Sequence, residues 1–147
     1  DIMTGVPGFT DVQVGSYLFM DCQYIEIGGA KNETVFDDFA PSLTVMTTIV
    51  NNNYPGRLVT DSGSKALTLN QPTAFVIGEP DFKYNAGSDE YGSITFEKSS
   101  KSYKVGDKLE VIVPHCDPVV NLYDFMYAIR KEKVESVLPI LARGKSQ

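Results

Sequence analysis

Short apolar runs broken by turn residues are the feature that most limits how this chain can fold. No segment of about twelve residues or more carries a helical apolar stripe with a cap at each end. Runs rich in Val, Ile, Thr, Phe and Tyr recur instead, and clusters of Gly, Pro and Asn separate them. This pattern is typical of strands joined by turns, so it predicts a mainly β domain.

The pattern also predicts where the strands lie. One or two helical turns at residues 35–40 are the only helix that it supports. Eight or nine short strands in a chain of 147 residues imply a single domain, folded as a sandwich or as a Greek-key, partly closed barrel. The predicted strands are residues 16–20, 43–50, 57–60, 72–77, 93–97 and 109–113, followed by a hairpin of 126–130 and 134–138 around a charged turn.

Charge and composition exclude several classes of partner. Nineteen Asp and Glu residues against thirteen Lys and Arg give a net charge of −6, whereas a nucleic-acid-binding face is basic. The same charge disfavours anionic membrane surfaces, and no apolar run approaches the roughly 20 residues that span a bilayer. The first residues lack the pattern of a signal peptide, and two cysteines make no disulfide framework. We therefore expect a cytoplasmic protein.

The single histidine, His115, stands two positions before Asp117. In an extended segment these two side chains point to the same face, and Cys116 points to the opposite one. An imidazole and a carboxylate at this spacing can chelate one Zn, Mn, Fe or Mg ion and leave its other positions open, as catalytic sites do. Pro114 and Pro118 restrict the backbone on either side. The alternative is that Asp117 only hydrogen-bonds His115 at the end of a strand.

Two other features could carry chemistry. Cys116 adjoins a histidine, but neighbours along a strand diverge, which favours a buried thiol over a nucleophile. The loop at residues 61–67 could hold an anion through its backbone N–H groups, or it could be an ordinary turn. Nothing in the sequence distinguishes Lys65 from the other lysines as a Schiff-base residue.

Four segments together resemble a known family, the C-terminal domain of D-threonine aldolases. With the eukaryotic-type D-serine dehydratases, these enzymes form a group of pyridoxal-phosphate enzymes with an alanine-racemase-like fold. The resemblance covers nearly the whole chain, and the His-x-Asp element is its most specific part. The segments are PHCDPVVNLYD at 114–124, DSGSKAL at 61–67, GSYLFMD at 15–21 and VLPILARG at 137–144.

The resemblance implies the roles of the site residues. In the family, an N-terminal β/α barrel carries the cofactor lysine, and the C-terminal β domain supplies two metal ligands. These ligands map to His115 and Asp117, with Mn, Mg or Zn as the metal. The dehydratase branch typically has Cys at the second position, so Asp117 favours the aldolase branch. Tyr91 stands where the family usually has His, and Ser62 stands where it usually has Ala.

By resemblance, residues 1–147 are then one metal-ligand-bearing domain of a larger lyase whose barrel is absent, and the isolated chain is expected to be inactive. The intact enzyme would use pyridoxal phosphate and a divalent metal to cleave D-β-hydroxy amino acids to glycine and an aldehyde, as a homodimer. Dehydration of D-serine is one alternative. The other is a non-catalytic β module for binding or assembly, in which His115 is structural.

Overall fold

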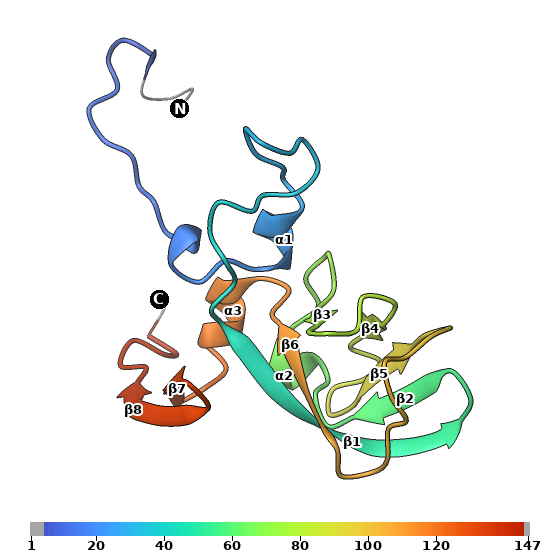
Figure 1. Ribbon diagram of the computed structural model, residues 1–147. Helices are drawn as coiled ribbons and strands as arrows, with labels where there is room; N and C mark the ends of the chain where they lie inside the picture. Colours follow the sequence, from blue (N-terminus) through green and yellow to red (C-terminus); the bar gives the residue numbers. More distant parts are fainter. Residues whose placement is uncertain (1–4, 146–147) are drawn as a thin grey trace.

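The structure, a computed structural model, describes residues 5–145, so the predicted domain of residues 1–147 extends past the described part at both ends. Its centre is one antiparallel sheet of six strands (Figure 1). The two outermost strands contact each other, which nearly closes the sheet into a barrel, and the predicted mainly β fold is confirmed. In spatial order the strands are β3 (Phe75–Val76), β6 (Lys108–Ile112), β1 (Thr44–Tyr54), β2 (Arg57–Thr60), β5 (Gly92–Thr95) and β4 (Lys83–Asn85).

The long strand β1 joins the two halves of this sheet. Its first half pairs with β6, beginning with Thr44 opposite Ile112. Its second half pairs with β2, beginning with Ile49 opposite Thr60, and the register shifts along this part. Such irregularities bend a strand and increase its twist, which allows the sheet to curve toward closure.

The hydrophobic core fills the inside of the barrel. Buried and exposed residues alternate along β6, as expected of a strand with one wet face. Ile94 of β5 is fully buried, and its register partners are Leu58 of β2 and Tyr84 of β4. The buried core residues are Ile49, Leu58, Leu67, Ala74, Val76, Phe82, Tyr84, Ala86, Ile94, Leu109, Val111, Val113, Cys116 and Val119.

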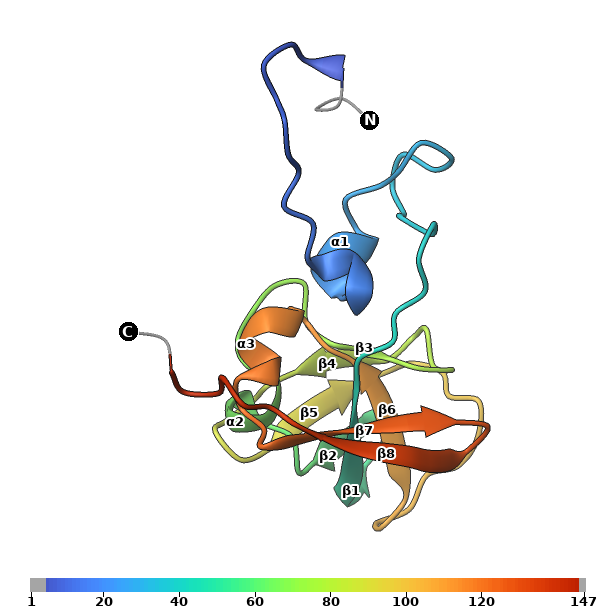
Figure 2. The same cartoon turned by 90° about the vertical axis from the view of Figure 1, so that its left-hand side faces the viewer.

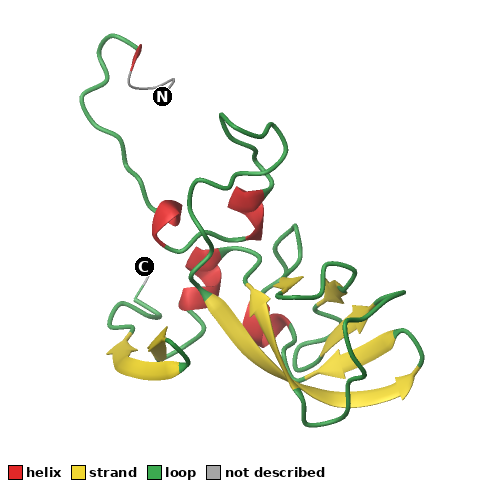
Figure 3. Ribbon diagram, in the orientation of Figure 1, coloured by secondary structure: helices red, strands yellow, loops and turns green. Residues whose placement is uncertain are grey.

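Short helices and one hairpin surround the barrel. Two of the helices, α1 and α3, lie next to each other at one end of it (Figures 1 and 2). None of the helices has more than five residues, and no helix among residues 5–145 has the length and apolar character needed to cross a membrane (Figure 3). The elements are the 3₁₀ helix η2 (Ser16–Leu18), α1 (Cys22–Ile25), α2 (Ser64–Leu67), α3 (Cys116–Val120), and the hairpin strands β7 (Phe125–Arg130) and β8 (Lys133–Pro139).

Most of the predicted strands are found. Those at 43–50, 57–60, 93–97 and 109–113 correspond to β1, β2, β5 and β6, and the predicted hairpin corresponds to β7 and β8. The hairpin turns through Lys131 and Glu132, both with positive φ, which is the twist that tight hairpins favour.

The strand predicted at 72–77 is much shorter than expected. It is reduced to Phe75–Val76, which pair with β6 at Ile112 and Val111. Pro72 has no N–H to donate to a sheet, so the residues around it cannot extend the strand.

The buried strand predicted at residues 16–20 is wrong. Residues Ser16–Leu18 form a 3₁₀ helix, Tyr17 and Leu18 are exposed, and Met20 is buried. The N–H of Met20 donates to the carbonyl of Ser16 at 2.7 Å, and Met20 has a φ of 53°. The chain therefore turns at this point and does not continue as a strand.

The helical turns predicted at residues 35–40 are also wrong. Oδ1 of Asn32 accepts the N–H groups of Thr34 and Val35, at 3.0 and 3.2 Å. The N–H of Phe36 then donates to the carbonyl of Ile25 at 2.8 Å. Side-chain acceptors of this kind compete with a helix for the same backbone donors, and residues 35–40 are not helical.

Candidate metal-binding site

His115 and Asp117 lie where β6 leads into α3. The backbone of His115 is extended, with φ −146° and ψ 129°, and His115 is the N-cap residue of α3. Cys116 already begins the helix, so the prediction that the extended segment continues through Asp117 is wrong. The physical reason is that Pro118 is tolerated in the first turn of a helix, and an acidic residue such as Asp117 is favoured there.

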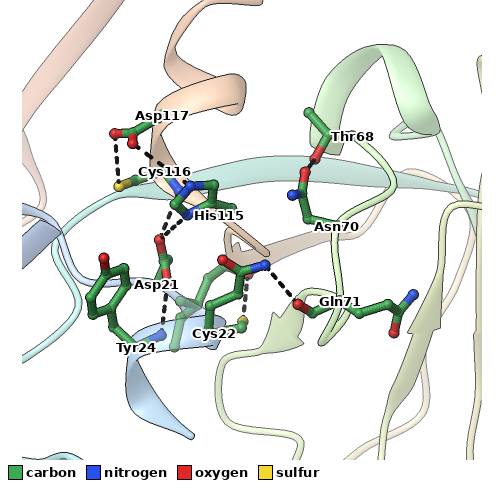
Figure 4. Close-up of polar contacts among 11 residues, drawn as sticks. Asp21, Cys22, Tyr24, Thr68, Asn70, Gln71, His115, Cys116 and Asp117 are labelled. Carbon is green, nitrogen blue, oxygen red and sulfur yellow. Dashed lines mark hydrogen bonds and ion pairs between the residues drawn. The ribbon is translucent and has the colours of Figure 1, made fainter. Parts of the chain in front are cut away.

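The two predicted ligands nevertheless face each other (Figure 4). Nε2 of His115 lies 3.7 Å from Oδ2 of Asp117. Two donor atoms about 2.1 Å from one ion lie about 3.4 Å apart at a tetrahedral angle, so this separation is close to what a shared cation requires. The side chain of Asp117 is 79% exposed and that of His115 is 23% exposed, so the pair is open to solvent on one side.

Asp21 lies on the other side of the imidazole ring. Its Oδ2 lies 2.9 Å from Nδ1 of His115 and also accepts the N–H of Cys116 at 2.9 Å. Its Oδ1 accepts the N–H of Tyr24 at 3.0 Å, which makes Asp21 the N-cap of α1. Burial alone would raise the pKa of Asp21, but the hydrogen bonds from Tyr24, Cys116 and His115 lower it below its usual value.

Cys116 points into the core, as predicted. Burial raises the pKa of its thiol to about 12, and its neighbours Asp21 and Asp117 act in the same direction. The thiol donates to Oδ1 of Asp117 at 3.5 Å. Asp21, His115 and Cys116 also have the spacing of metal ligands. A protonated thiol is a poor ligand, however, and the Asp21 carboxylate already serves two backbone donors, so we favour His115 with Asp117.

The loop at residues 61–67 is a structural turn in the described chain. Its candidate anion-binding donors are the N–H groups of Gly63, Ser64 and Lys65, and these donate to the carbonyls of residues 90, 88 and 89 respectively. The ammonium of Lys65 pairs with the carboxylate of Glu90. Of the two alternatives for this loop, the contacts favour the turn.

The two residues that depart from the family pattern, Ser62 and Tyr91, both make hydrogen bonds in the structure. Ser62 is buried, and its hydroxyl donates to Oγ1 of Thr47 at 2.8 Å and lies 3.1 Å from Oγ1 of Thr60. Tyr91 is exposed, and its N–H donates to the hydroxyl of Ser88 at 3.1 Å.

Asp21 was missed as a site residue by sequence reasoning. The segment GSYLFMD ends at Asp21, and an Asp before a short apolar run is a signal for a helix N-cap. That signal could have indicated a cap on Cys22–Ile25. It could not have indicated contact with His115, which lies 94 residues further along the chain.

A nearly closed β barrel that presents an imidazole and a carboxylate at the start of a short helix defines a β domain with a candidate cation site. Residues 42–129 match the model of a family described as the putative serine dehydratase domain. The chain belongs to that family, which confirms the predicted resemblance. The matched residues include His115 and Asp117 but not Asp21.

Two relatives of this chain are named as aldolases. It is 36% identical over 138 residues to the 3-hydroxy-D-aspartate aldolase of Paracoccus denitrificans (strain Pd 1222), which covers 93% of this chain and 35% of the relative. It is 34% identical over 147 residues to the D-threonine aldolase of Arthrobacter sp, which covers 100% of this chain and 37% of the relative.

A solved structure of an aldolase is also similar to this chain. The D-threonine aldolase from Filomicrobium marinum superposes with a TM-score of 0.80 at 28% identity, over 89% of this chain and 35% of the other. The chain therefore spans about a third of the length of the proteins that it matches.

Proposed function

We propose that this chain is the metal-binding β domain of a larger, pyridoxal-phosphate-dependent lyase that cleaves D-β-hydroxy amino acids to glycine and an aldehyde. The aldolase names of the relatives support this class of reaction. The chain spans about a third of those proteins, so an N-terminal β/α barrel that carries the cofactor lysine is part of the proposal. A homodimeric, cytoplasmic enzyme is part of it too: the homodimer rests on the family resemblance, and the cytoplasmic location rests on the two cysteines, which make no disulfide framework.

One observation carries this proposal: the 3.7 Å approach of His115 Nε2 to Asp117 Oδ2 at a surface that solvent can reach. A nitrogen and a carboxylate oxygen suit Mn, Mg or Zn, and two protein donors leave the other coordination positions for water or substrate. The donor set therefore fits a divalent cation.

The residues of this chain would have the following roles in the proposed reaction. His115 and Asp117 would bind the cation, and the exposure of Asp117 would leave the cation open to a substrate hydroxyl. Cys116 and Pro114, the two neighbours of His115 along the chain, are both buried, so solvent reaches neither of them. A divalent cation bound there would lower the pKa of a coordinated hydroxyl or water. Pyridoxal phosphate, bound by the barrel, would accept the electrons released as the Cα–Cβ bond breaks.

The test uses the full-length enzyme that contains this chain. We expect H115A and D117A each to abolish release of glycine and acetaldehyde from D-threonine while the cofactor absorbance is kept, and we expect EDTA to have the same effect on the wild type. The matched control is D124A, because Asp124 is likewise exposed, at 70%, and follows α3. Turnover that survives EDTA, or that D117A leaves unchanged, would contradict the proposal.

Dehydration of D-serine is the second candidate, and the description of the matched family favours it. The same site would then assist loss of the β-hydroxyl group. The two reactions differ in their products, since dehydration yields pyruvate and ammonia. By resemblance, Asp117 in place of the Cys typical of dehydratases favours the aldolase. A binding or assembly module would show neither activity.

A further inference from the structure

Asp21 is a buried acid that has no role in the proposed reaction. Its side chain has no exposed surface, and it lies in the segment before residues 42–129, which match the family. We propose that Asp21 is a positioning residue, which holds the proton of the His115 ring on Nδ1 and leaves the Nε2 lone pair facing Asp117. The purpose of this arrangement rests on the proposed function, because a cation needs that lone pair.

The contacts of Asp21 determine which partner donates. Its Oδ1 accepts the N–H of Tyr24, and its Oδ2 accepts the N–H of Cys116. A backbone N–H can only donate, so both carboxylate oxygens act as acceptors. An ionised carboxylate has no hydrogen to donate, so Nδ1 of His115, 2.9 Å from Oδ2, carries the hydrogen of the bond between them.

A proton on Nδ1 has a direct consequence for Nε2. In a neutral imidazole, one nitrogen carries a proton and the other keeps a lone pair. The histidine side chain in water favours the proton on Nε2, so Asp21 reverses this preference. The lone pair then lies on Nε2, the atom 3.7 Å from Asp117. Metal ligands must be deprotonated at the binding atom, so only this form of His115 can bind a cation beside Asp117.

The position of Asp21 is itself fixed by backbone hydrogen bonds of the two residues that follow it. The N–H of Cys22 donates to the carbonyl of Val113 at 3.0 Å, and the N–H of Gln23 donates to that of Pro114 at 3.3 Å. The start of α1 is thus bound to the two residues that precede His115. Carboxylates that hold the far nitrogen of a ligating histidine fix its orientation and raise its basicity, and their loss lowers metal affinity about 10- to 100-fold.

Nitrogen NMR of the imidazole tests this assignment without any metal. The chain has one histidine, so ¹⁵N-histidine labelling reports on His115 alone. The spectrum is taken at about pH 9, where a histidine of ordinary pKa is neutral. We expect the wild type to show a proton on Nδ1 and a lone pair on Nε2. The reverse pattern would overturn the proposal with no mutant needed.

Two variants separate positioning from stability. D21S keeps a good N-cap for α1 but is too short to reach His115. The matched control is E79Q, which alters another buried carboxylate that accepts backbone and hydroxyl donors, far from the imidazole in sequence. We expect the proton of His115 to move toward Nε2 in D21S and to stay on Nδ1 in E79Q. A folded D21S that keeps the wild-type spectrum would overturn the proposal.

Titration of the same proteins with Mn²⁺ adds a second readout. We expect D21S to bind about 10- to 100-fold more weakly than wild type, and E79Q to bind equally well. Equal affinity in D21S and wild type would overturn the positioning role. If the wild type binds no Mn²⁺, the claim that this chain alone holds the metal fails, whereas the spectra still decide whether Asp21 holds the proton on Nδ1.

Discussion

The carboxylate of Asp21 accepts the backbone N–H of Cys116 at 2.9 Å, although 95 residues separate the two along the chain. The same carboxylate caps α1 through Tyr24, so one side chain satisfies the N-termini of two helices. These helices have four and five residues and are too short to be stable alone. The segment before the barrel and the candidate site therefore form one structural unit.

Both cysteines should be unreactive in the folded chain. Burial raises the pKa of Cys22 and that of Cys116 to about 12, so almost no thiolate exists near neutral pH. We expect iodoacetamide at about pH 8 to modify neither thiol in the native state and both in denaturant, as counted by mass spectrometry. Rapid labelling of Cys116 in the native state would contradict this prediction, because it would show that solvent reaches the thiol next to His115 and Asp117.

Replacing Gly92 by Ala should destabilise the barrel. A Cβ there would lie 2.5 Å from the carbonyl oxygen of Ser62 and 2.6 Å from the hydroxyl of Tyr84. Relieving these overlaps requires backbone movement, which costs about 1–3 kcal/mol in the free energy of unfolding. Urea denaturation measures this loss. The control is G15A, where an added Cβ meets no described atom within 4 Å. Equal urea denaturation midpoints for G92A and wild type would contradict the close packing of Ser62 and Tyr84 against Gly92.

The buried acid Glu79 should make stability depend on pH. Burial alone would raise its pKa, but hydrogen bonds from Ser100 and Tyr103 lower it below its usual value. A lowered pKa in the folded state contributes stability above the unfolded-state pKa, and this contribution is lost as the pH falls through the folded-state pKa. We expect wild type to lose stability more steeply than E79Q below about pH 5. Parallel stability curves for the two proteins would contradict this assignment.

The core should tolerate truncation far less than the surface. Ile94 is fully buried in the core of the barrel, and replacing it by Ala should cost about 2–5 kcal/mol in the free energy of unfolding. Leu69 is exposed, so L69A should change this free energy by less than about 0.5 kcal/mol. Chemical denaturation compares the two. Similar losses for both variants would mean that the barrel is not packed around Ile94.

Most strands of the barrel could be predicted from the sequence, because each has a recognisable pattern of residues within its own segment. Alternation along residues 93–97 indicates a strand with one solvent-exposed face, the Val and Ile residues of 109–113 indicate another strand, and the charged turn within 126–138 indicates a hairpin. The same reasoning failed at residues 16–20, because local hydrogen bonds turn the chain there. The apolar run ends at Asp21, which is the N-cap of α1. Runs of this length are consistent with a strand or a turn until tertiary contacts decide.

Only part of the candidate site could be predicted from the sequence. Two residue types at close spacing pointed to His115 and Asp117, and the side chains do meet, although through a helix start and not through an extended strand. Asp21 could not be found this way, because nothing local reports a contact made 94 residues away.

The most direct test of the central claim is electron spin-echo envelope modulation of Mn²⁺ bound to this chain. His115 is its only histidine, so modulation from an imidazole nitrogen has a single source. The account predicts nitrogen modulation in the wild type, its loss in H115A, and weaker Mn²⁺ binding in D117A. Mn²⁺ bound without nitrogen modulation, or bound equally well by all three proteins, would contradict the assignment of His115 and Asp117 as metal ligands.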